Sequence, residues 1–262
     1  MITVKDKVVI ITGSGQGIGR AYAETLAADG VKVVIAEINE VTGKDVEKLI
    51  KSNGGQAIFV QTDVTRYDSV QNMVQAAIGN FGRIDALVNN AAIYYGIDPN
   101  PFTEISEDEW DRMMAVNVKG TWNCTRAVAP QMIKQEKGKI INVASSVAFE
   151  GKGMFMHYVA SKGALVSMTR AMARELADMG GNGITVNTLA PGAIEGEASV
   201  KLGEAMRNIK GFTGKGGPVA GQILKRRGTS NDLVGPLVYL ISDASDFMTG
   251  SVLTVNGGSS LH

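Results

Sequence analysis

Short apolar runs alternate along the chain with longer segments patterned like helices, and this alternation constrains the fold more than any other feature. The runs are rich in Val and Ile and lie at Val8–Thr12, Val31–Ala36, Ala57–Gln61, Ala86–Asn89, Lys139–Val143, Ile184–Thr188 and Val252–Val255. Most are apolar on both faces, which is typical of parallel strands covered on both sides. The helical patterns between them span Ile18–Asp29, Val41–Ser52, Ser69–Phe81, Asp108–Lys134 and Tyr158–Met179. Repeated β–α–β units with right-handed crossovers predict an α/β fold, namely a Rossmann-type doubly wound parallel sheet with helices on both faces.

Length and composition narrow the class of protein further. The 262 residues contain no internal repeat or linker, so we expect one domain over residues 1–262. The 26 basic residues balance 26 acidic ones, which argues against a general nucleic-acid partner. A single cysteine, Cys124, and two histidines, His157 and His262, exclude an internal disulfide and a Cys/His zinc cage, so we expect no metal. The apolar runs are too short for a membrane span, and no signal-peptide core precedes the first run, which predicts a cytoplasmic protein without a membrane partner.

One segment departs from the alternating pattern. Residues 192–228 include nine glycines and show no strand signal. The segment follows the end of a strand, where ligands bind in sheets of this kind, so we predict that it covers the substrate. The alternative is an insertion without a function.

A glycine-rich sequence joins the first run to the first helical pattern, reading Thr12-Gly13-Ser14-Gly15-Gln16-Gly17-Ile18-Gly19. At this glycine content about 0.5 such patterns are expected per chain by chance, so the pattern alone is weak evidence for a nucleotide site. Its position is informative, because a strand, a tight turn and a helix start bring backbone N–H groups and the positive helix end to one point, which suits a phosphate. An ordinary tight turn is the alternative. We expect a dinucleotide to contact Gly13, Ser14, Gln16, Gly17, Ile18 and Gly19.

Glu37 ends the second apolar run, 18 residues after Gly19. An acidic residue at about this separation accepts hydrogen bonds from the adenosine ribose hydroxyls. It also opposes a 2′-phosphate, since two like charges ~4 Å apart repel by about 4 kcal/mol at an effective dielectric of ~20. Neither Ser14, Gln16, Ile38 nor Asn39 supplies a compensating positive charge. The sequence therefore predicts NAD rather than NADP, unless Glu37 is a solvent-facing loop carboxylate.

Tyr158 and Lys162 lie four residues apart and so share one helix face. A phenol of pKa ~10 is a poor base at neutral pH, and lowering its pKa to ~7 requires about 4 kcal/mol. Lys162 and an oxidised nicotinamide together could supply it. Ser145 lies 13 residues before Tyr158, just past the fifth run, where its hydroxyl can hold a substrate oxygen. Ser146 is the alternative serine, and the spacing favours Ser145.

Taken together, these features resemble the short-chain dehydrogenase/reductase family in its single-domain form. The resemblance runs from Lys7 to Gly258 and is nearest to NAD-dependent secondary-alcohol dehydrogenases, including 1-arylethanol types. It rests on the glycine-rich sequence, Asp63-Val64, Asn89-Asn90-Ala91-Ala92, Asn117, Ser145, Tyr158 with Lys162, and Pro191-Gly192. Two positions depart from the family pattern: Ala92 replaces a glycine, and Gly196 replaces a threonine that anchors the nicotinamide carboxamide in many members.

The resemblance implies roles for particular residues. Tyr158 is the general acid and base, Ser145 orients the carbonyl or hydroxyl, and Lys162 lowers the pKa of Tyr158 and binds the nicotinamide ribose. Asn117 helps to hold a water-linked proton relay to Lys162. Further cofactor contacts fall at Asp63, Val64, Asn89, Ala91, Pro191, Gly192 and Ile194.

The expected reaction is the NAD-dependent interconversion of a secondary alcohol and its ketone. Bulky residues near the site favour an apolar or aromatic substrate, and the pocket candidates are Tyr94, Tyr95, Met154, Phe155 and Met206. A 3-oxoacyl-carrier, polyol or steroid reductase shares the same motifs and stays open. A non-catalytic NAD sensor also stays open, although it has no reason to keep both Tyr158 and Lys162. The family implies a homodimer or homotetramer, formed through the two longest helical patterns.

Overall fold

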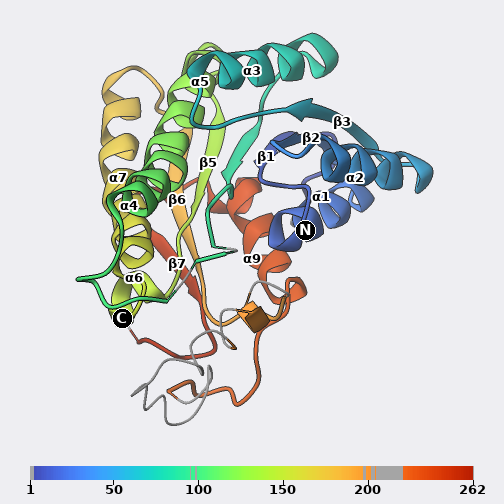
Figure 1. Cartoon of the computed structure of the whole chain (residues 1–262). Coiled ribbons are helices and arrows are strands. Elements are labelled where there is room, and N and C mark those ends of the chain that lie inside the picture. The colour runs from blue at the N-terminus through green and yellow to red at the C-terminus, as the bar shows by residue number, and fades with distance from the viewer. Residues whose placement is uncertain are drawn as a thin grey trace.

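A seven-stranded parallel sheet organises the molecule, in the strand order β3-β2-β1-β4-β5-β6-β7 (Figure 1). The computed structural model describes residues 3–94, 96–97, 99–196, 199–201, 204 and 221–261. The strands are β1 Val8–Thr12, β2 Lys32–Glu37, β3 Gln56–Gln61, β4 Ala86–Asn89, β5 Gly138–Val143, β6 Ile184–Pro191 and β7 Val252–Val255. The order reverses between β1 and β4, which is the topological switch point of a doubly wound sheet. The predicted fold class is confirmed.

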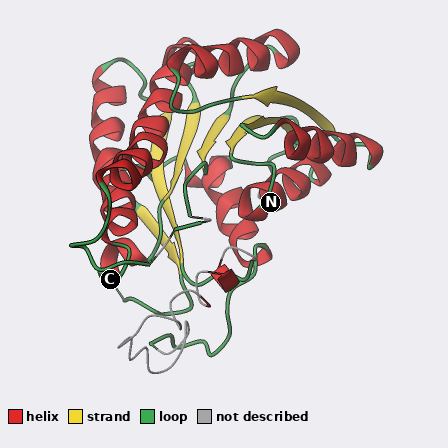
Figure 2. Cartoon of the chain, in the orientation of Figure 1, coloured by secondary structure: helices red, strands yellow, loops and turns green. Residues whose placement is uncertain are grey.

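Helices cover both faces of the sheet (Figure 2). One face carries α1 (Gly17–Ala28), α2 (Glu40–Ser52) and α9 (Asn231–Ile241). The opposite face carries α3 (Tyr67–Phe81), α5 (Gly120–Lys134) and α7 (Met156–Asp178). The shorter elements are α4 (Glu107–Met114), a π-helical turn (Ala115–Lys119), α6 (Val147–Glu150) and a 3₁₀ turn (Asp243–Ser245). Within the described residues, no helix is long and apolar enough to cross a membrane.

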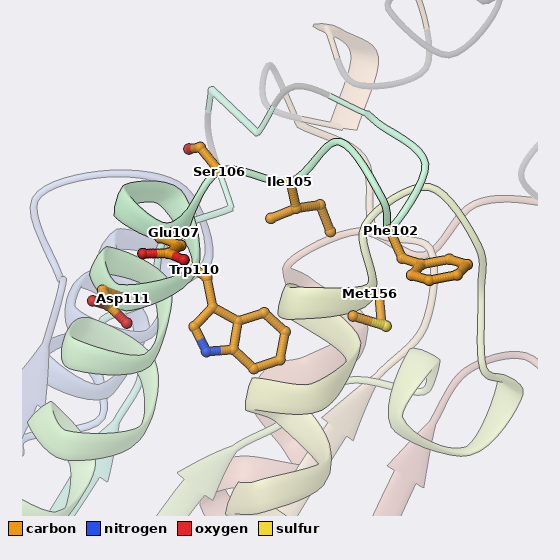
Figure 3. A pocket seen from close by; sticks show the side chains of 7 residues that line it. All are labelled: Phe102, Ile105, Ser106, Glu107, Trp110, Asp111 and Met156. Atoms are coloured by element: carbon orange, nitrogen blue, oxygen red, sulfur yellow. The ribbon is translucent and has the colours of Figure 1, made fainter.

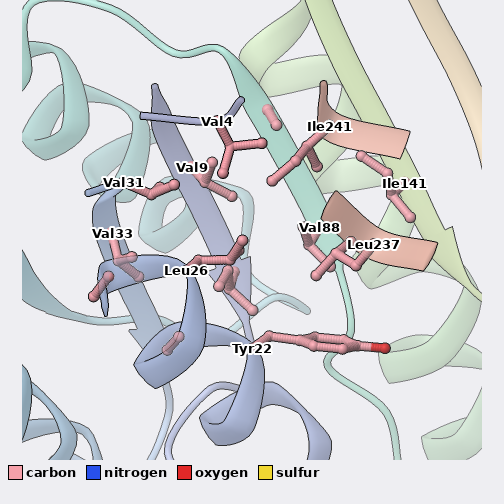
Figure 4. Packing of buried hydrophobic residues seen from close by; sticks show 14 of the residues in the cluster. Val4, Val9, Tyr22, Leu26, Val31, Val33, Val88, Ile141, Leu237 and Ile241 are labelled. Atoms are coloured by element: carbon pink, nitrogen blue, oxygen red, sulfur yellow. The ribbon is translucent and has the colours of Figure 1, made fainter. Parts of the chain in front are cut away.

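The two hydrophobic cores explain why the strands are apolar on both faces. Val9 and Ile11 of β1 pack with Tyr22 and Leu26 of α1 in one cluster, part of which is drawn in Figure 4. Val8 and Ile10 of the same strand belong to the cluster on the opposite face, together with side chains of α3, α5 and α7. Since successive residues of a strand point to opposite faces, a strand with a core on each side needs an apolar residue at every position.

The structure differs from the sequence-based expectation in three elements. The pattern over Asp108–Lys134 contains α4, the π-helical turn and α5 rather than one uniform helix. Strand β6 continues to Pro191, because Leu189 and Ala190 are buried and β6 pairs with β7 as far as Pro191–Val255. Helix α9 follows residues 192–228 and was not anticipated.

Three polar side chains lie opposite one another across the middle of the sheet. Asn89 of β4, Asn142 of β5 and Thr188 of β6 are register partners. Asn89 Nδ2 donates to Asn142 Oδ1 (2.9 Å), and Asn142 Nδ2 donates to Thr169 Oγ1 on α7 (2.8 Å). Thr188 Oγ1 donates to the same Thr169 hydroxyl (2.8 Å). This buried network fastens α7 to the sheet.

Charged groups gather at the amino ends of the strands, away from the glycine-rich loop. The Asp85 carboxylate accepts a hydrogen bond from Val8 N (2.8 Å) and pairs with Arg83 (2.7 Å). Lys139, which is buried, pairs with Asp246 (2.6 Å). These contacts support the end of the sheet opposite the loop.

Candidate active site

The glycine-rich loop is held by contacts that leave no room for side chains at two of its glycines. Gly13 has φ +63°, and a Cβ there would lie 2.8 Å from Ala91 Cα. A Cβ on Gly19 would lie 2.3 Å from the Gly13 carbonyl oxygen. Asn90 Nδ2 donates to the carbonyl oxygens of Thr12 and Gly13, both at 3.0 Å. The loop conformation therefore depends on Asn90, a residue that the sequence analysis quoted in a motif but gave no role.

The start of α1 fits a phosphate. Gly17 opens the helix with φ +56°, and a Cβ on it would meet no atom within 4 Å. The N-cap residue Gln16 makes no side-chain hydrogen bond to the first turn, so the first N–H groups at the positive end of the helix are not capped by it. Gln16 precedes the helix in extended conformation. Ser14 differs from expectation in one respect: the residue is buried and its hydroxyl donates inward to Ile11 O (2.8 Å), so its side chain is not available to a ligand.

Glu37 closes the opposite side of the loop. Its carboxylate is buried and accepts hydrogen bonds from the backbone N–H groups of Gly15 (2.9 Å), Ile38 (2.9 Å) and Asn39 (3.1 Å). The alternative of a solvent-facing carboxylate is therefore wrong. Three N–H donors fix the position of its negative charge beside the glycine-rich loop.

The residues expected near the adenine lie after β3. Asp63 Oδ1 accepts from Thr65 N (2.9 Å) and Thr65 Oγ1 (2.7 Å), which shapes the turn. Val64 is buried, and its carbonyl oxygen accepts from Asn123 Nδ2 (2.9 Å). Contacts with Thr65 therefore hold Asp63 in place, and the contact with Asn123 of α5 holds Val64. Whether they contact the adenine stays a prediction.

The expectation for Asn89 needs correction. Its side chain belongs to the buried network across the sheet, where it donates to Thr125 Oγ1 (3.1 Å) as well as to Asn142. Its side chain does not line the groove, because it points into the core while that of the next residue, Asn90, turns toward the loop. A cofactor contact from the main chain of Asn89 stays a prediction. Ala91 lies against Gly13, as a groove residue should.

Ser145, Tyr158 and Lys162 meet at the carboxyl end of β5. The Ser145 hydroxyl lies next to the Tyr158 phenol, close enough to lower its pKa. Lys162 Nζ lies 5.7 Å from the centre of the Tyr158 ring and donates to Val143 O (2.8 Å). Ser146, in contrast, is buried at the start of α6. The helix spacing and the end of β5 thus bring together the three side chains that the sequence selected.

Burial dominates the electrostatics of this trio. Burial raises the pKa of the Tyr158 phenol above its usual value. The electrostatic interaction with the Tyr94 phenol also raises this pKa, whereas the Ser145 hydroxyl lowers it. Burial also lowers the pKa of Lys162 to about 7. The expected lowering of the Tyr158 pKa by Lys162 is therefore wrong for the protein alone, since desolvation disfavours both charged forms. A positive charge brought by a ligand is needed to make the phenolate accessible.

Asn117 lies in the π-helical turn, and its side chain is fully engaged. Its Oδ1 accepts from Ile93 N (2.8 Å), and its Nδ2 donates to Ser161 Oγ (3.0 Å), which places it beside the residue before Lys162. The main-chain oxygen of Asn117 accepts from Thr121 Oγ1 (2.9 Å). Within the described part of the chain, Asn117 does not touch Lys162 directly, and a water-linked relay between them stays a prediction. Single turns of π-helix often mark functional sites.

The residues proposed for the substrate pocket separate into three groups. The Tyr94 ring lies 5.3 Å from the Tyr158 ring and is half-buried, so it is placed to contact a substrate. Phe155 is buried among Ile97 and Met113 and packs edge-on against Tyr158, which makes it a core residue. Met154 is half-buried beside the same cluster. Tyr95 and Met206 lie outside the described residues, as does much of the segment 192–228.

A surface hollow of about 250 Å³ lies beside this cluster, between α4 and the start of α7 (Figure 3). It is lined by Phe102, Ile105, Ser106, Glu107, Trp110, Asp111 and Met156. Next to Met156, His157 is buried and its Nε2 lies 2.9 Å from Glu109 Oε1 on α4. His157 is thus turned toward α4 and away from the Tyr158 ring. This contact disfavours a role for His157 in relaying a proton to or from Tyr158.

The carboxyl end of β6 lies on the other side of the site. Gly192 N donates to Val255 O (3.0 Å), and a Cβ on Gly192 would lie 2.6 Å from Asn256 Cα. Ile194 is half-buried and forms an isolated parallel bridge with Gly228. Gly196 is exposed and offers no hydroxyl, so the departure from the family pattern is real. Pro191 ends β6, and its contact with a nicotinamide stays a prediction.

A helix start that fits a phosphate and a Ser–Tyr–Lys trio at the carboxyl end of β5, in a doubly wound sheet, define a nucleotide-dependent oxidoreductase. The sequence pattern of the family described as short chain dehydrogenase matches residues 7–207. The chain belongs to this family.

Its relatives span nearly the whole chain. The chain is 37% identical to the short chain dehydrogenase/reductase astE of Aspergillus oryzae, covering 99% of this chain and 97% of the relative. It is 35% identical to the 3-oxoacyl-[acyl-carrier-protein] reductase FabG of Staphylococcus epidermidis, with 97% and 98% covered. Among solved structures, an NAD⁺-bound xylitol dehydrogenase superposes with a TM-score of 0.90 at 30% identity, covering 97% of this chain and 99% of that one.

Proposed function

We propose that this oxidoreductase uses NAD to interconvert a secondary alcohol and its ketone, and that its substrate is apolar or aromatic, of the 1-arylethanol kind. The observation that carries the proposal is the position of the half-buried Ser145 hydroxyl next to the buried Tyr158 phenol, with Lys162 Nζ 5.7 Å from the centre of the Tyr158 ring. The half-buried Tyr94 ring beside Tyr158 supports an apolar or aromatic substrate.

In the mechanism, the hydroxyls of Ser145 and Tyr158 hold the substrate oxygen between them. When bound, NAD supplies the hydride chemistry at its nicotinamide ring. During ketone reduction Tyr158 donates the proton to the carbonyl oxygen, and during alcohol oxidation it removes the hydroxyl proton. Because burial raises the pKa of the phenol, Tyr158 is protonated in the protein alone and is ready to act as an acid.

Lys162 supplies positive charge next to the phenol when it is protonated, and with a pKa of about 7 it changes its charge near neutral pH. Its hydrogen bond to Val143 O fixes the amine at the carboxyl end of β5. There it would bind the nicotinamide ribose. The expected water-linked relay would then pass the proton from Tyr158 past Lys162 to Asn117.

The preference for NAD over NADP rests on Glu37. Its carboxylate is fixed by three N–H donors, so a 2′-phosphate at the ribose would meet a negative charge that cannot turn away. The NAD⁺ bound to the xylitol dehydrogenase relative agrees with this proposal. Replacing Glu37 by Gln should lower kcat/KM for NAD and raise kcat/KM for NADP. The ratio of kcat/KM for NAD to kcat/KM for NADP should then fall by at least about tenfold. An unchanged ratio would contradict the assignment.

A second candidate is the reduction of a 3-oxoacyl thioester, which the 35% identical FabG relative favours. A panel of 1-arylethanols, polyols and 3-hydroxyacyl thioesters, followed by nicotinamide absorbance, separates the candidates. Preference for the thioester by tenfold or more would replace the aryl-alcohol proposal.

The decisive variant is Tyr158→Phe. It keeps the ring that packs against Tyr94 and Phe155 but removes the hydroxyl. We expect turnover to fall by about 10²- to 10⁴-fold with NAD affinity preserved, because only proton transfer is lost. Phe149 lies nearby on α6 and is not part of the trio, so Phe149→Leu serves as a control with near-normal turnover. Undiminished turnover in Tyr158→Phe would remove Tyr158 from the mechanism, and loss of NAD binding as well would indicate misfolding.

We further propose that the protein works as a homodimer or homotetramer through α5 and α7. Helix α7 carries the half-buried small residues Ala160, Gly163 and Ala164, and Trp122 of α5 is exposed. Such small and apolar side chains allow close helix packing. Light scattering should give two or four times the chain mass of 27.7 kDa, and a monomer at micromolar concentration would contradict this.

A further inference from the structure

Tyr158 lies in a part of α7 that the helix itself holds weakly. Helix α7 begins at Met156, so Tyr158 belongs to the first turn, whose N–H groups have no partners within the helix. The residue before the helix, Phe155, makes no side-chain hydrogen bond to this turn. Met154, which comes before Phe155, has a φ of +74°, which is unfavourable for a residue other than glycine. The position of the Tyr158 phenol therefore depends on contacts from outside α7.

One such contact comes from α4, which packs against α7 (Figure 3). His157, the residue before Tyr158, has no exposed surface, and its Nε2 lies 2.9 Å from Glu109 Oε1. A carboxylate only accepts hydrogen bonds, so Nε2 is the donor. Among the described residues, the other ring nitrogen of His157, Nδ1, is buried and has no hydrogen-bond partner. The bond to Glu109 thus fixes the ring of His157, and with it the main chain next to Tyr158.

The start of α4 directs Glu109 toward α7. Residues 106–109 read Ser-Glu-Asp-Glu, the pattern of a capping box, in which the glutamate side chain returns to the N–H of the serine. Within the described residues only half of this box is formed: Ser106 Oγ accepts from Glu109 N (3.2 Å), while the Glu109 carboxylate binds His157. One helical turn further along α4, Met113 belongs to the apolar cluster around the catalytic phenol. One face of α4 therefore supplies both a carboxylate and an apolar side chain to the first turn of α7.

A second polar contact holds the next turn of α7. Asn117 Nδ2 donates to Ser161 Oγ (3.0 Å), and Ser161 Oγ donates to the carbonyl oxygen of Tyr158 (2.8 Å). His157 and Ser161 lie four residues apart and so share one face of the helix. Tyr158 thus lies along the helix between two side chains that are hydrogen-bonded to the α4 side of the molecule.

We propose that His157 and Glu109 are positioning residues, which hold the first turn of α7 so that the Tyr158 hydroxyl meets the substrate oxygen at the correct distance. The inference rests on the proposed dehydrogenase function and adds to it a pair that acts through Tyr158. A role in stability alone fits the pair less well, because burying an imidazole with an unpaired nitrogen costs free energy that a leucine would not cost. Displacing a catalytic group by about 1 Å can lower the rate by about 10²-fold, so a bond that holds the proton donor affects turnover directly.

The test separates turnover from binding, with the best substrate of the panel described above. His157→Phe keeps a ring of similar size but removes the donor, and we expect kcat to fall by about 10- to 100-fold. KM for the substrate and Kd for NAD should change by less than about threefold, because the pair acts on the position of the phenol. His157→Gln keeps an N–H donor at the same number of bonds from Cα as Nε2 and should hold kcat within about threefold of the wild-type value.

Glu109→Met breaks the same bond from the other side, at a half-buried position, and provides the comparison if His157→Phe does not fold. It should lower kcat as much as His157→Phe does. The double variant should lose no more than either single variant, because each removes the same interaction. Full additivity of the two losses would contradict the pairing.

Two further variants serve as controls. Asp108→Asn removes a carboxylate from the same turn of α4 at an exposed position, and Asp85→Asn weakens a buried contact at the opposite end of the sheet. Both should keep kcat within about threefold of the wild-type value. Normal kcat in His157→Phe, an equal loss in His157→Gln, or an equal loss in either control would overturn the proposal.

A structural measurement tests the pair without turnover. If the wild type turns over no compound of the panel, the dehydrogenase proposal fails, and crystal structures of the wild type and Glu109→Met still decide the role of the pair. A Tyr158 hydroxyl displaced relative to Lys162 by about 0.5 Å or more supports the positioning role, and an unchanged position refutes it.

Discussion

The buried amine of Lys162 makes the stability of the protein depend on pH in a defined direction. Burial lowers its pKa from the usual 10.5 to about 7. In the unfolded chain the amine is protonated up to a pH of about 10, so between these values unfolding takes up one proton. Stability therefore rises with pH in this range, by about 1.4 kcal/mol per pH unit or about 3 kcal/mol from about pH 7 to about pH 9. Below about pH 7 both states carry the proton, and the dependence disappears.

Urea unfolding of the protein without added cofactor measures this effect. The wild type and Lys48→Met, which removes an exposed lysine, should share the full rise between about pH 7 and about pH 9. In Lys162→Met, the rise in the free energy of unfolding over this pH range should be smaller by about 3 kcal/mol. Loss of the hydrogen bond to Val143 O lowers the stability by the same amount at every pH and does not affect this rise. Contributions from other groups cancel in the comparison of slopes. Parallel pH profiles for wild type and Lys162→Met would refute the reasoning, because they would mean that the amine is solvated in the folded protein.

Two further substitutions test the loop and the opposite end of the sheet. Gly19→Ala would place a Cβ 2.3 Å from Gly13 O, so we expect NAD affinity, measured by fluorescence titration, to fall at least about tenfold; an unchanged Kd would show that the loop adapts. Asp85→Asn weakens the pairing with Arg83 and Val8 N and should lower the free energy of unfolding by about 1–3 kcal/mol with KM for NAD unchanged, whereas the exposed Asp68→Asn should cost less than about 0.5 kcal/mol.

The sequence predicted most of what depends on local pattern. Val8–Thr12, Ala86–Asn89 and Val252–Val255 are strands with the expected bounds. The first two are buried at every position, because a strand between two cores shows its apolar character throughout. Tyr158 and Lys162 share a helix face because the helical repeat fixes residues four apart. Ser145 lies next to Tyr158 because it closely follows β5, at whose carboxyl end α7 places the phenol.

What the sequence could not give depends on contacts between distant segments. Nothing in the local sequence distinguishes Asn89 from Asn90. Because of the pleat of β4, the Asn89 side chain points into the core, whereas the Asn90 side chain binds the glycine-rich loop. The sign of the Tyr158 pKa shift follows from burial, which only the packed structure reveals.

The polar network across β4, β5 and β6 has a consequence for how the chain reaches its native state. Strands made of Val and Ile are nearly interchangeable as neighbours, and a slip of one residue would cost their apolar contacts little. Such a slip would turn Asn89 or Asn142 toward the wrong face and leave buried amides without partners, at about 1–3 kcal/mol for each group. Thr169, on the helix that bears Tyr158 and Lys162, can join the network only when the alignment is correct. The buried amides therefore favour the correct strand register during folding, and the helix that bears Tyr158 and Lys162 docks on the sheet only in that register.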